Sequence, residues 1–212
     1  MMKSEPDKTV TPSDETLAVA PTARERILRA AARLYAIKGF EGTSMHDIAD
    51  AAGVTKPLIF YHFESKERLY ASLLREALAT CRMGGREILG GPITATEKLK
   101  RFLTSHVAVV RDKPEVFAFA HNLLTLSRDL PLGFDYRTEG RELFAQVTRV
   151  IEEGQASGEF RQADPAAIAV LPVAALGMYA DALLIGEIQT LPAGLEDLLL
   201  DLLLHGIKEH SE

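Results

Sequence analysis

The chain has 212 residues, a single cysteine and a formal net charge of −6. A chain of this length can bury a substantial core and form one or two domains. A single cysteine excludes an intrachain disulfide, and the composition gives no sign of an oxidising compartment. We therefore expect a protein of the cytoplasm.

The first 21 residues and the most apolar segment bear on targeting. Residues 1–21 carry charges among Pro, Ser and Thr and lack the apolar block of a signal peptide, so we expect a disordered arm. With four acidic residues against two basic ones, this arm is a poor candidate for binding DNA. The longest apolar run, residues 166–180, is shorter than the roughly 20 residues of a membrane span. It is also interrupted by Pro172, so we expect no membrane span.

The first predicted helix follows this arm. Thr22 can cap it, and Glu25 completes a capping box three residues later. Gly39 ends it. Apolar residues that recur at three- and four-residue steps predict one buried face: Ile27, Ala30, Ala31, Leu34 and Ile37.

A second helix begins after Ser44, which can cap it together with Asp47. Gly53 follows this helix at a position that favours a left-handed backbone, so the chain turns sharply there. Val54 can fill the corner between this helix and the next. The expected buried face consists of Ile48, Ala51 and Ala52.

The third helix starts at a cap, Thr55, and tolerates Pro57 in its first turn, where a backbone N–H has no intrahelical partner. Ser65 can cap a fourth helix, with Lys66 in its first turn. A cation there opposes the helix dipole, so a nearby DNA phosphate or simple solvent exposure must account for it. The expected buried side of the third helix is Ile59, Phe60 and Phe63. Its outer side and ends should carry Lys56, Leu58, Tyr61 and His62.

Two short helices joined at a glycine turn form a helix-turn-helix, whose second helix enters the major groove of DNA by its N-terminus. The charge distribution agrees with this interpretation. Residues 22–68 contain eight Lys or Arg against six Asp or Glu, a balance of +2, whereas residues 69–212 contain fourteen against twenty, a balance of −6. This asymmetry is typical of a DNA-binding head on an acidic body.

The segment from Thr22 to about Leu74, roughly a quarter of the chain, resembles the DNA-binding domain of the TetR family, the tetracycline-repressor-like regulators. The matching motifs are Gly39-Phe40, Thr43-Ser44, Ile48-Ala49, Ala52-Gly53-Val54, Lys56, Tyr61-His62-Phe63 and Ser65-Lys66-Glu67. The resemblance implies an all-α homodimer that binds a palindromic operator in double-stranded DNA and carries a variable ligand-binding domain. Pro57 and Leu58 depart from the family pattern, which favours apolar contact with thymine methyl groups at this surface.

We therefore expect an all-α fold with an N-terminal three-helix helix-turn-helix DNA-binding domain, residues 22–70, and a C-terminal helical ligand-binding and dimerisation domain, residues 71–212. The expected DNA contacts are Thr43, Ser44, Thr55, Lys56, Leu58, Tyr61, His62 and Lys66.

Five further helices are predicted in the second domain. Thr94 and Glu97 form a capping-box pattern at the first of them, and Asp112 is expected to open the second. Asp164 followed by Pro165 marks another helix start. The expected ranges are about 94–111, 112–127, 134–156, 164–190 and 195–208.

The last two of these helices are candidates for a dimer interface. The first carries small residues that permit close helix approach: Ala174, Ala175, Gly177 and Ala182. The second carries a broad apolar stripe: Leu195, Leu198, Leu199, Leu202 and Leu203. Either a core within one protomer or an interface between two protomers explains this pattern. We favour the interface, because two-fold DNA recognition needs a dimer.

A ligand cavity is expected among the apolar helices of the second domain, since ligand pockets are mostly apolar with a few polar groups. Any single one of these residues is also explained by a core or surface position. The candidates are Phe102, His106, His121, Asn122, Tyr136, Met178, Tyr179 and Asp181.

An enzyme is the less favoured alternative. His106 and His121 with Asp112 or Asp181 would supply an acid–base pair, but the sequence has no nucleophile motif, phosphate loop or metal-ligand spacing. We expect no cofactor and no metal. The sequence thus predicts a transcriptional repressor released from DNA by a small-molecule inducer of unknown identity. Control by a protein partner remains an alternative.

Overall fold

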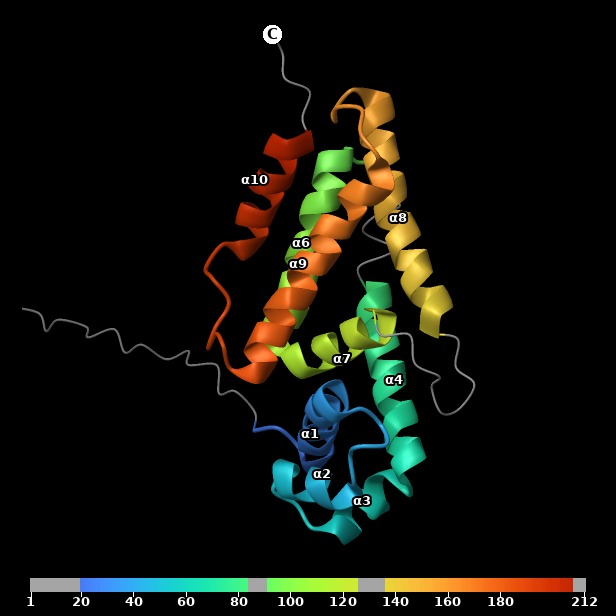
Figure 1. Ribbon diagram of the computed structural model, residues 1–212, viewed down its shortest axis with the longest axis vertical. Helices are drawn as coiled ribbons and strands as arrows, with labels where there is room; N and C mark the ends of the chain where they lie inside the picture. Colours follow the sequence, from blue (N-terminus) through green and yellow to red (C-terminus); the bar gives the residue numbers. More distant parts are fainter. Residues whose placement is uncertain (1–19, 84–90, 126–135, 208–212) are drawn as a thin grey trace, which may run out of the picture.

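The computed structural model describes residues 20–83, 91–125 and 136–207, so the expected N-terminal arm lies almost wholly outside the described residues. The described ranges contain nine α-helices and no strand (Figure 1), which confirms the all-α class. The helices are α1 Ala23–Lys38, α2 Met45–Ala52, α3 Lys56–Phe63, α4 Lys66–Met83, α6 Ala95–Asp112, α7 Pro114–Thr125, α8 Tyr136–Ser157, α9 Pro165–Ile185 and α10 Leu195–Ile207.

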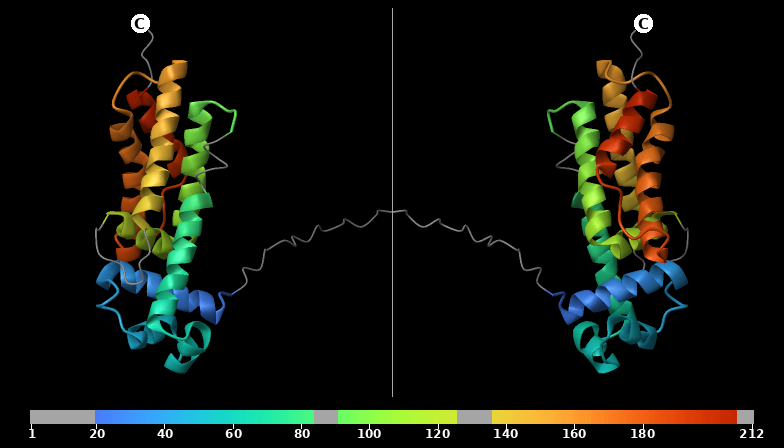
Figure 2. Two further views of the ribbon diagram at one scale, coloured as in Figure 1. Left: turned by 90° about the vertical axis from the view of Figure 1, so that its right-hand side faces the viewer. Right: turned by 90° about the vertical axis from the view of Figure 1, so that its left-hand side faces the viewer.

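The helices form a small head and a longer body. Helices α1 to α3 gather at one end of the molecule, and α4 runs from them along the body (Figures 1 and 2). Helices α6, α8, α9 and α10 extend along the long axis of the molecule. Helix α7 lies across this axis and packs against α1 and α4 on the head side and against α9 on the body side (Figure 1).

The predicted caps of the head are largely confirmed. The Thr22 hydroxyl accepts a hydrogen bond from the backbone N–H of Glu25, and the Glu25 carboxylate accepts one in return from the backbone of Thr22. Ser44 and Asp47 make the same reciprocal pair at α2. Gly53 adopts the left-handed conformation, with φ of 62°. Thr55 precedes α3 as predicted, but its side chain makes no capping hydrogen bond.

Three residues expected on buried faces of the head are exposed, and these predictions were wrong. Ile37 is 53% exposed and Phe60 41% exposed, and Ala51 also faces solvent. The spacing of apolar residues shows that a helix has an apolar face. It does not show which part of that face the neighbouring helices bury. Helix α1 packs against α2, α4 and α7, and its buried arc is therefore turned toward Leu28 and Tyr35.

Several predicted boundaries in the body need correction. Asp112 is the last residue of α6, and the next helix begins at Pro114. Helix α9 ends at Ile185, five residues before the expected end, because Gly186 turns the chain there with φ of 81°.

The predicted cap at the start of α6 is present, because the Thr94 hydroxyl accepts a hydrogen bond from the backbone N–H of Glu97. The carboxylate of Glu159 caps the same turn. Its oxygens accept hydrogen bonds from the backbone N–H groups of Ala95 and Thr96, with N–O distances of 3.1 and 3.0 Å.

Helix α9 also corrects the argument about membranes. It continues through Pro172 without interruption and has 21 residues. By length and composition alone it is apolar enough to cross a membrane, with a mean hydropathy of 2.0. One face of α9 nevertheless packs in the core of the body, and this packing accounts for its apolar composition. The core residues of that face are Ile168, Ala169, Leu176, Ala180 and Leu184.

The head is joined to the body by aromatic packing around Phe119 of α7. The Phe119 ring lies 5.5 Å from the ring of Tyr70 on α4 and 6.3 Å from that of Tyr35 on α1. Tyr70 in turn packs edge-on against Phe40, at 4.9 Å. Val116, Phe119 and the neighbouring Ala120 thus belong to the hydrophobic core of the DNA-binding helices.

Truncation of this contact tests its importance. Phe119→Ala removes a ring that is 2% exposed, so the free energy of unfolding should fall by about 3–5 kcal/mol. The matched control is Ile37→Ala on the exposed side of α1, which should change it by only about 0.5 kcal/mol. Urea denaturation of both variants measures the difference. A loss for Phe119→Ala no larger than that for Ile37→Ala would contradict the prediction.

Candidate DNA-binding surface and ligand cavity

Helix α3 exposes the side on which DNA contacts were predicted. Ile59 and Phe63, 0% and 4% exposed, anchor its inner side in the head core. Tyr61 is 82% exposed, an unusual position for a large aromatic side chain. Its ring packs edge-on against that of His62, at 5.3 Å. Thr55 and Lys56 at the N-terminal end are exposed as well, and Leu58 and His62 are half-buried.

Two of the predicted DNA contacts have hydroxyl groups that form hydrogen bonds inside the protein. Thr43 is only 1% exposed, and its hydroxyl donates to the backbone oxygen of Gly39 at 2.9 Å. Its side chain is therefore not available at the surface, and this prediction was wrong. Ser44 is exposed, although its hydroxyl is engaged with Asp47.

Lys66 has a reason for its place in the first turn of α4 that involves no DNA. Its ammonium group lies over the ring of Phe40, 4.2 Å from the centroid, and such a cation–π contact is favourable by about 0.5–1 kcal/mol or more. The side chain is half-buried. Lys66 thus closes the aromatic cluster at the end opposite Phe119, and this contact accounts for a cation at that position.

The head therefore presents the N-terminal end of α3, with an exposed threonine and lysine, and an exposed tyrosine farther along the same helix. Backbone N–H groups in the first turn of a helix lack intrahelical partners, and together with the helix dipole they favour a phosphate. The buried inner side of α3 holds the helix rigidly against α1, α2 and α4. This is the geometry that inserts a helix into the major groove.

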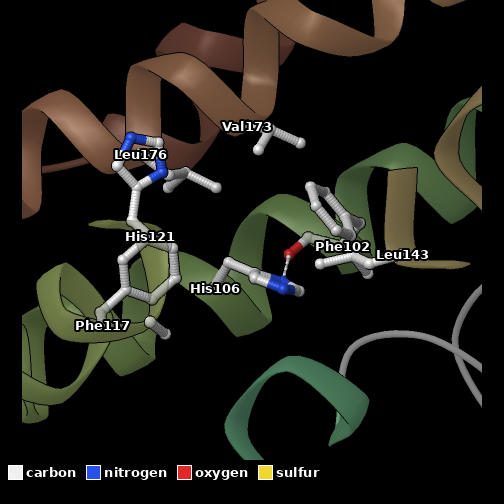
Figure 3. Close-up of a pocket in the computed structure, with 8 residues that line it drawn as sticks. Phe102, His106, Phe117, His121, Leu143, Val173 and Leu176 are labelled. Atoms are coloured by element: carbon white, nitrogen blue, oxygen red, sulfur yellow. Dashed lines mark hydrogen bonds between the residues drawn. The ribbon is translucent and has the colours of Figure 1, made fainter. Parts of the chain in front are cut away.

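A second candidate site is a cavity of about 30 Å³ between α6, α7, α8 and α9 (Figure 3). By the usual measure this volume holds only a few water molecules. Apart from two histidines the lining is wholly apolar. The lining residues are Phe102, His106, Phe117, Ala120, His121, Leu143, Val173 and Leu176.

His106 is the most buried polar side chain of this cavity, with 4% of its surface exposed. Its Nδ1 lies 2.9 Å from the backbone oxygen of Phe102, one helical turn earlier (Figure 3). Its ring packs against the ring of Phe102, at 4.1 Å, and edge-on against that of Phe117, at 6.2 Å. Burial lowers the pKa of His106 to about 4, although the hydrogen bond to Phe102 acts in the opposite direction.

His121 forms another part of the wall. Its ring lies directly against Gly177 of α9, where a Cβ would overlap the imidazole. Gly177 therefore provides room for His121 within the protomer, which corrects its assignment to a dimer contact. Burial lowers the pKa of His121, and the charge of Asp181 opposes this. Burial likewise raises the pKa of Asp181, against the effect of His121.

The structure places three of the eight predicted ligand residues, Phe102, His106 and His121, in the cavity lining. Met178 is 67% exposed on the opposite side of α9, so its assignment was wrong. The side chain of Tyr136 lies outside the described residues. The predicted residues that do not line the cavity are Asn122, Tyr179 and Asp181. The lining residues absent from the prediction are Phe117, Ala120, Leu143, Val173 and Leu176.

Comparison with known proteins identifies both parts of the chain. Residues 27–73 match the family model described as bacterial regulatory proteins, tetR family, and residues 95–194 match the tetracyclin repressor-like C-terminal domain. The chain is 32% identical to the HTH-type transcriptional repressor KstR2 of Rhodococcus jostii over 158 residues, which cover 71% of this chain and 73% of that protein. The chain belongs to the TetR family of transcriptional regulators.

Other relatives agree with this membership. KstR2 of Mycolicibacterium smegmatis is 32% identical over 140 residues, 65% of this chain and 67% of that protein. The structure of the ketosteroid transcriptional regulator KstR2 of Mycobacterium tuberculosis has the same fold. Its TM-score is 0.69 at 20% identity, and the match covers 89% of this chain and 96% of that one. As a TetR-family member the protein is a DNA-binding regulator of transcription and not an enzyme. The acid–base interpretation of His106 and His121 is therefore set aside.

The environment of His106 predicts a pH dependence of stability. Its pKa is lowered in the folded protein, from an ordinary 6.5 to about 4, so the unfolded chain binds the proton more tightly. Stability is therefore complete above pH 6.5 and is lost as the pH falls toward 4. Between pH 7 and pH 5 this group should cost about 2 kcal/mol.

Urea denaturation at the two pH values measures this effect. His106→Phe should lose less stability than the wild type between pH 7 and pH 5, whereas His205→Gln, at an exposed histidine, should behave like the wild type. His121 contributes equally in all three proteins. An identical pH dependence for His106→Phe and the wild type would contradict the prediction.

Proposed function

We propose that the protein is a cytoplasmic repressor that binds a palindromic operator as a homodimer and leaves it when a small molecule enters the cavity. The observation that carries this proposal is the pairing of an exposed recognition helix with an apolar cavity elsewhere in one TetR-family chain. The KstR2 relatives are named as repressors, which supports repression.

The proposed division into domains places the boundary within α4. Residues 22–70 would form the DNA-binding domain and residues 71–212 the ligand-binding and dimerisation domain. Helix α4 contributes Leu69 and Tyr70 to the head core and continues with Leu73, Leu74 and Leu78 toward α7. Since α4 belongs to both parts, a tilt of this helix would move the head relative to the body.

The DNA contacts that we propose are those predicted residues that remain at the surface. Lys56 and Thr55 lie at the N-terminus of α3, where they would meet phosphates, and Tyr61 lies farther along its exposed side. Leu58 is placed to contact a thymine methyl group. Ser44 and His62 complete the set, and Lys66 would reach a phosphate only by leaving the Phe40 ring.

Two substitutions test this surface. Tyr61→Phe should weaken binding to all duplexes alike by about tenfold, because the variant cannot donate a hydrogen bond to a charged phosphate. Lys56→Ala should lower the slope of log affinity against log salt by about 0.9 for each phosphate that the lysine neutralises. Fluorescence anisotropy measures both, with an operator selected from random duplexes. The matched control is Tyr70→Phe, which removes the hydroxyl of a buried tyrosine of the head and should leave DNA affinity unchanged. If Tyr61→Phe and Lys56→Ala both bind DNA with the affinity and salt dependence of the wild type, the proposed DNA contacts are wrong.

The dimer surface that we propose is an exposed apolar stripe on α9 and α10. Apart from the adjacent Val170 and Leu171, its members are one or two helical turns apart on each helix, and each is about half exposed or more. They are Val170, Leu171, Met178 and Ile185 on α9, and Leu198 and Leu202 on α10. The small residues Ala167 and Ala174 lie on the same exposed side of α9. Large apolar patches on the surface of a protomer mark interaction sites.

Only part of the stripe expected on α10 fits this surface. Leu195 and Leu203 are 0% and 7% exposed, and they pack in the core of the protomer together with Leu199. For these three leucines the alternative of an intramolecular core is correct. Leu198 and Leu202 point away from that core and remain available to a partner.

A charge in the stripe tests the dimer. Leu202→Arg should give a folded monomer, because this side chain is 62% exposed in the protomer but would become an unpaired buried charge in the dimer, at a cost of several kcal/mol. Leu202→Met preserves the apolar contact and should remain dimeric. Analytical ultracentrifugation and circular dichroism report mass and folding. A dimeric Leu202→Arg variant of normal stability would place the interface elsewhere.

A further inference from the structure

One side chain that lines the cavity, His106, has hydrogen-bonding capacity that is unused within the described part of the chain. The Nε2 atom of His106 is buried and has no hydrogen-bond partner there. More than 90% of buried polar groups in proteins have a partner. His106 is 4% exposed and stands among apolar neighbours in the cavity lining.

The hydrogen bonds of the opposite ring nitrogen determine what Nε2 can do. The backbone oxygen of Phe102 can only accept, so Nδ1 of His106, 2.9 Å away, must carry the proton. The Ser105 hydroxyl donates to the same backbone oxygen, at 2.9 Å, and lies 3.2 Å from Nδ1, where it can share the Nδ1 proton. Since burial lowers the pKa of His106 to about 4, the ring holds a single proton at neutral pH. Nε2 therefore presents a lone pair.

We propose that the cavity binds a neutral, mostly apolar molecule that donates a hydrogen bond to Nε2 of His106, as an alcohol or a phenol does. This assignment rests on the proposed function, in which the cavity is the regulatory site. It adds a selection rule, because the ligand must carry a hydroxyl or N–H group at the point where it meets His106.

The same geometry excludes other ligand classes at this atom. A ketone, ether, ester or carboxylate oxygen can only accept and would face the Nε2 lone pair. A cation is disfavoured because the lining contains no carboxylate and is otherwise apolar. Asp181 lies near His121 but does not line the cavity.

The cavity must widen for anything larger than a few atoms, and its walls differ in how readily they can move. Four of the lining residues, Phe102, His106, Ala120 and Leu176, are fully buried. The other four lining residues are only partly buried, and partly buried side chains change rotamer at lower cost than fully packed ones. These four are Phe117, His121, Leu143 and Val173. A ligand with one ring or a short chain therefore fits the site better than a large one.

Pairs of probes with equal shape and different hydrogen bonding test the rule. Cyclohexanol and cyclohexanone form one pair, and 2-propanol and acetone form a smaller pair. Titrations of the full-length protein followed by NMR give affinities and the nitrogen chemical shift of Nε2. Each alcohol should bind roughly two- to tenfold more tightly than its ketone, the range of one net hydrogen bond. Each alcohol should also shift the Nε2 signal, whereas each ketone should not.

Variants locate the effect. His106→Phe keeps an aromatic ring of similar shape and should bind alcohol and ketone equally. Ser105→Ala retains His106 with its Nδ1–Phe102 bond and should keep the preference for the alcohol. The Nε2 signal of the wild type provides the decisive readout if His106→Phe does not fold.

Several outcomes would overturn the inference. Equal affinities within both pairs, an unmoved Nε2 signal, or no binding of any probe at millimolar concentration would each do so. The Nε2 signal would stay unmoved if a water molecule were permanently bound to Nε2. Anisotropy of the protein–operator complex separates this inference from the proposed function. If cyclohexanol binds through His106 and the DNA stays bound, release by ligand fails while the hydroxyl rule stands. If cyclohexanone releases the DNA as well as cyclohexanol does, release stands and the rule fails.

Discussion

The ring of Phe119 packs against both Tyr35 and Tyr70, which also contact each other, and through this contact α7 holds the DNA-binding helices to the rest of the chain. The four aromatic rings of this cluster come from α1, the turn after α1, α4 and α7. Lys66 closes the cluster with its ammonium group over Phe40. The orientation of the head thus depends on a small number of large, well-packed side chains. Such packing resists gradual deformation and favours discrete arrangements.

Helix α7 has a second role on its other side, where Phe117, Ala120 and His121 line the cavity. Ala120 belongs to the head core as well as to the cavity lining. Under the proposed function, a ligand that widened the cavity would push on α7, the helix that packs against the head. It can shift the protein only by its differential affinity for two arrangements, and the usual coupling of about 1–3 kcal/mol would change operator affinity roughly 5- to 150-fold.

Local interactions made much of the fold predictable from sequence. The Thr22–Glu25 and Ser44–Asp47 capping boxes and the left-handed Gly53 depend on residues a few positions apart, so their patterns carried over to the structure. The faces of Ile37 and Phe60 depend on which helices arrive from elsewhere, and periodicity alone misplaced both. Thr43 looked like a surface residue because its partner is a backbone oxygen, which no side-chain pattern reveals.

The cavity was harder to predict for the same reason. Its polar members His106 and His121 stood out as histidines in apolar helices. Leu143, Val173 and Leu176 are ordinary core residues in sequence, and only the meeting of four helices makes them a lining. Gly177 was predicted to allow helix approach, and it does provide close approach, but to the His121 ring and not to a second protomer. The small size of Gly177 predicted a close contact, but only the tertiary structure shows that the contact is with His121.

Helix α9 connects the cavity to the proposed dimer surface, which includes no residue of α7. One side of α9 carries Val173 and Leu176 in the cavity wall, and the other side carries Leu171 and Met178 in the proposed dimer stripe. Two-fold recognition requires half-sites roughly 34–36 Å apart, or a multiple of that distance. In a dimer the separation of the two heads depends on how each head sits on its body and how the bodies meet. Residues of α7 and α9 both line the cavity. Under the proposed function, α7 would set how each head sits on its body, and α9 would set how the two bodies meet. A ligand there can therefore spoil the spacing of both recognition helices without approaching the DNA.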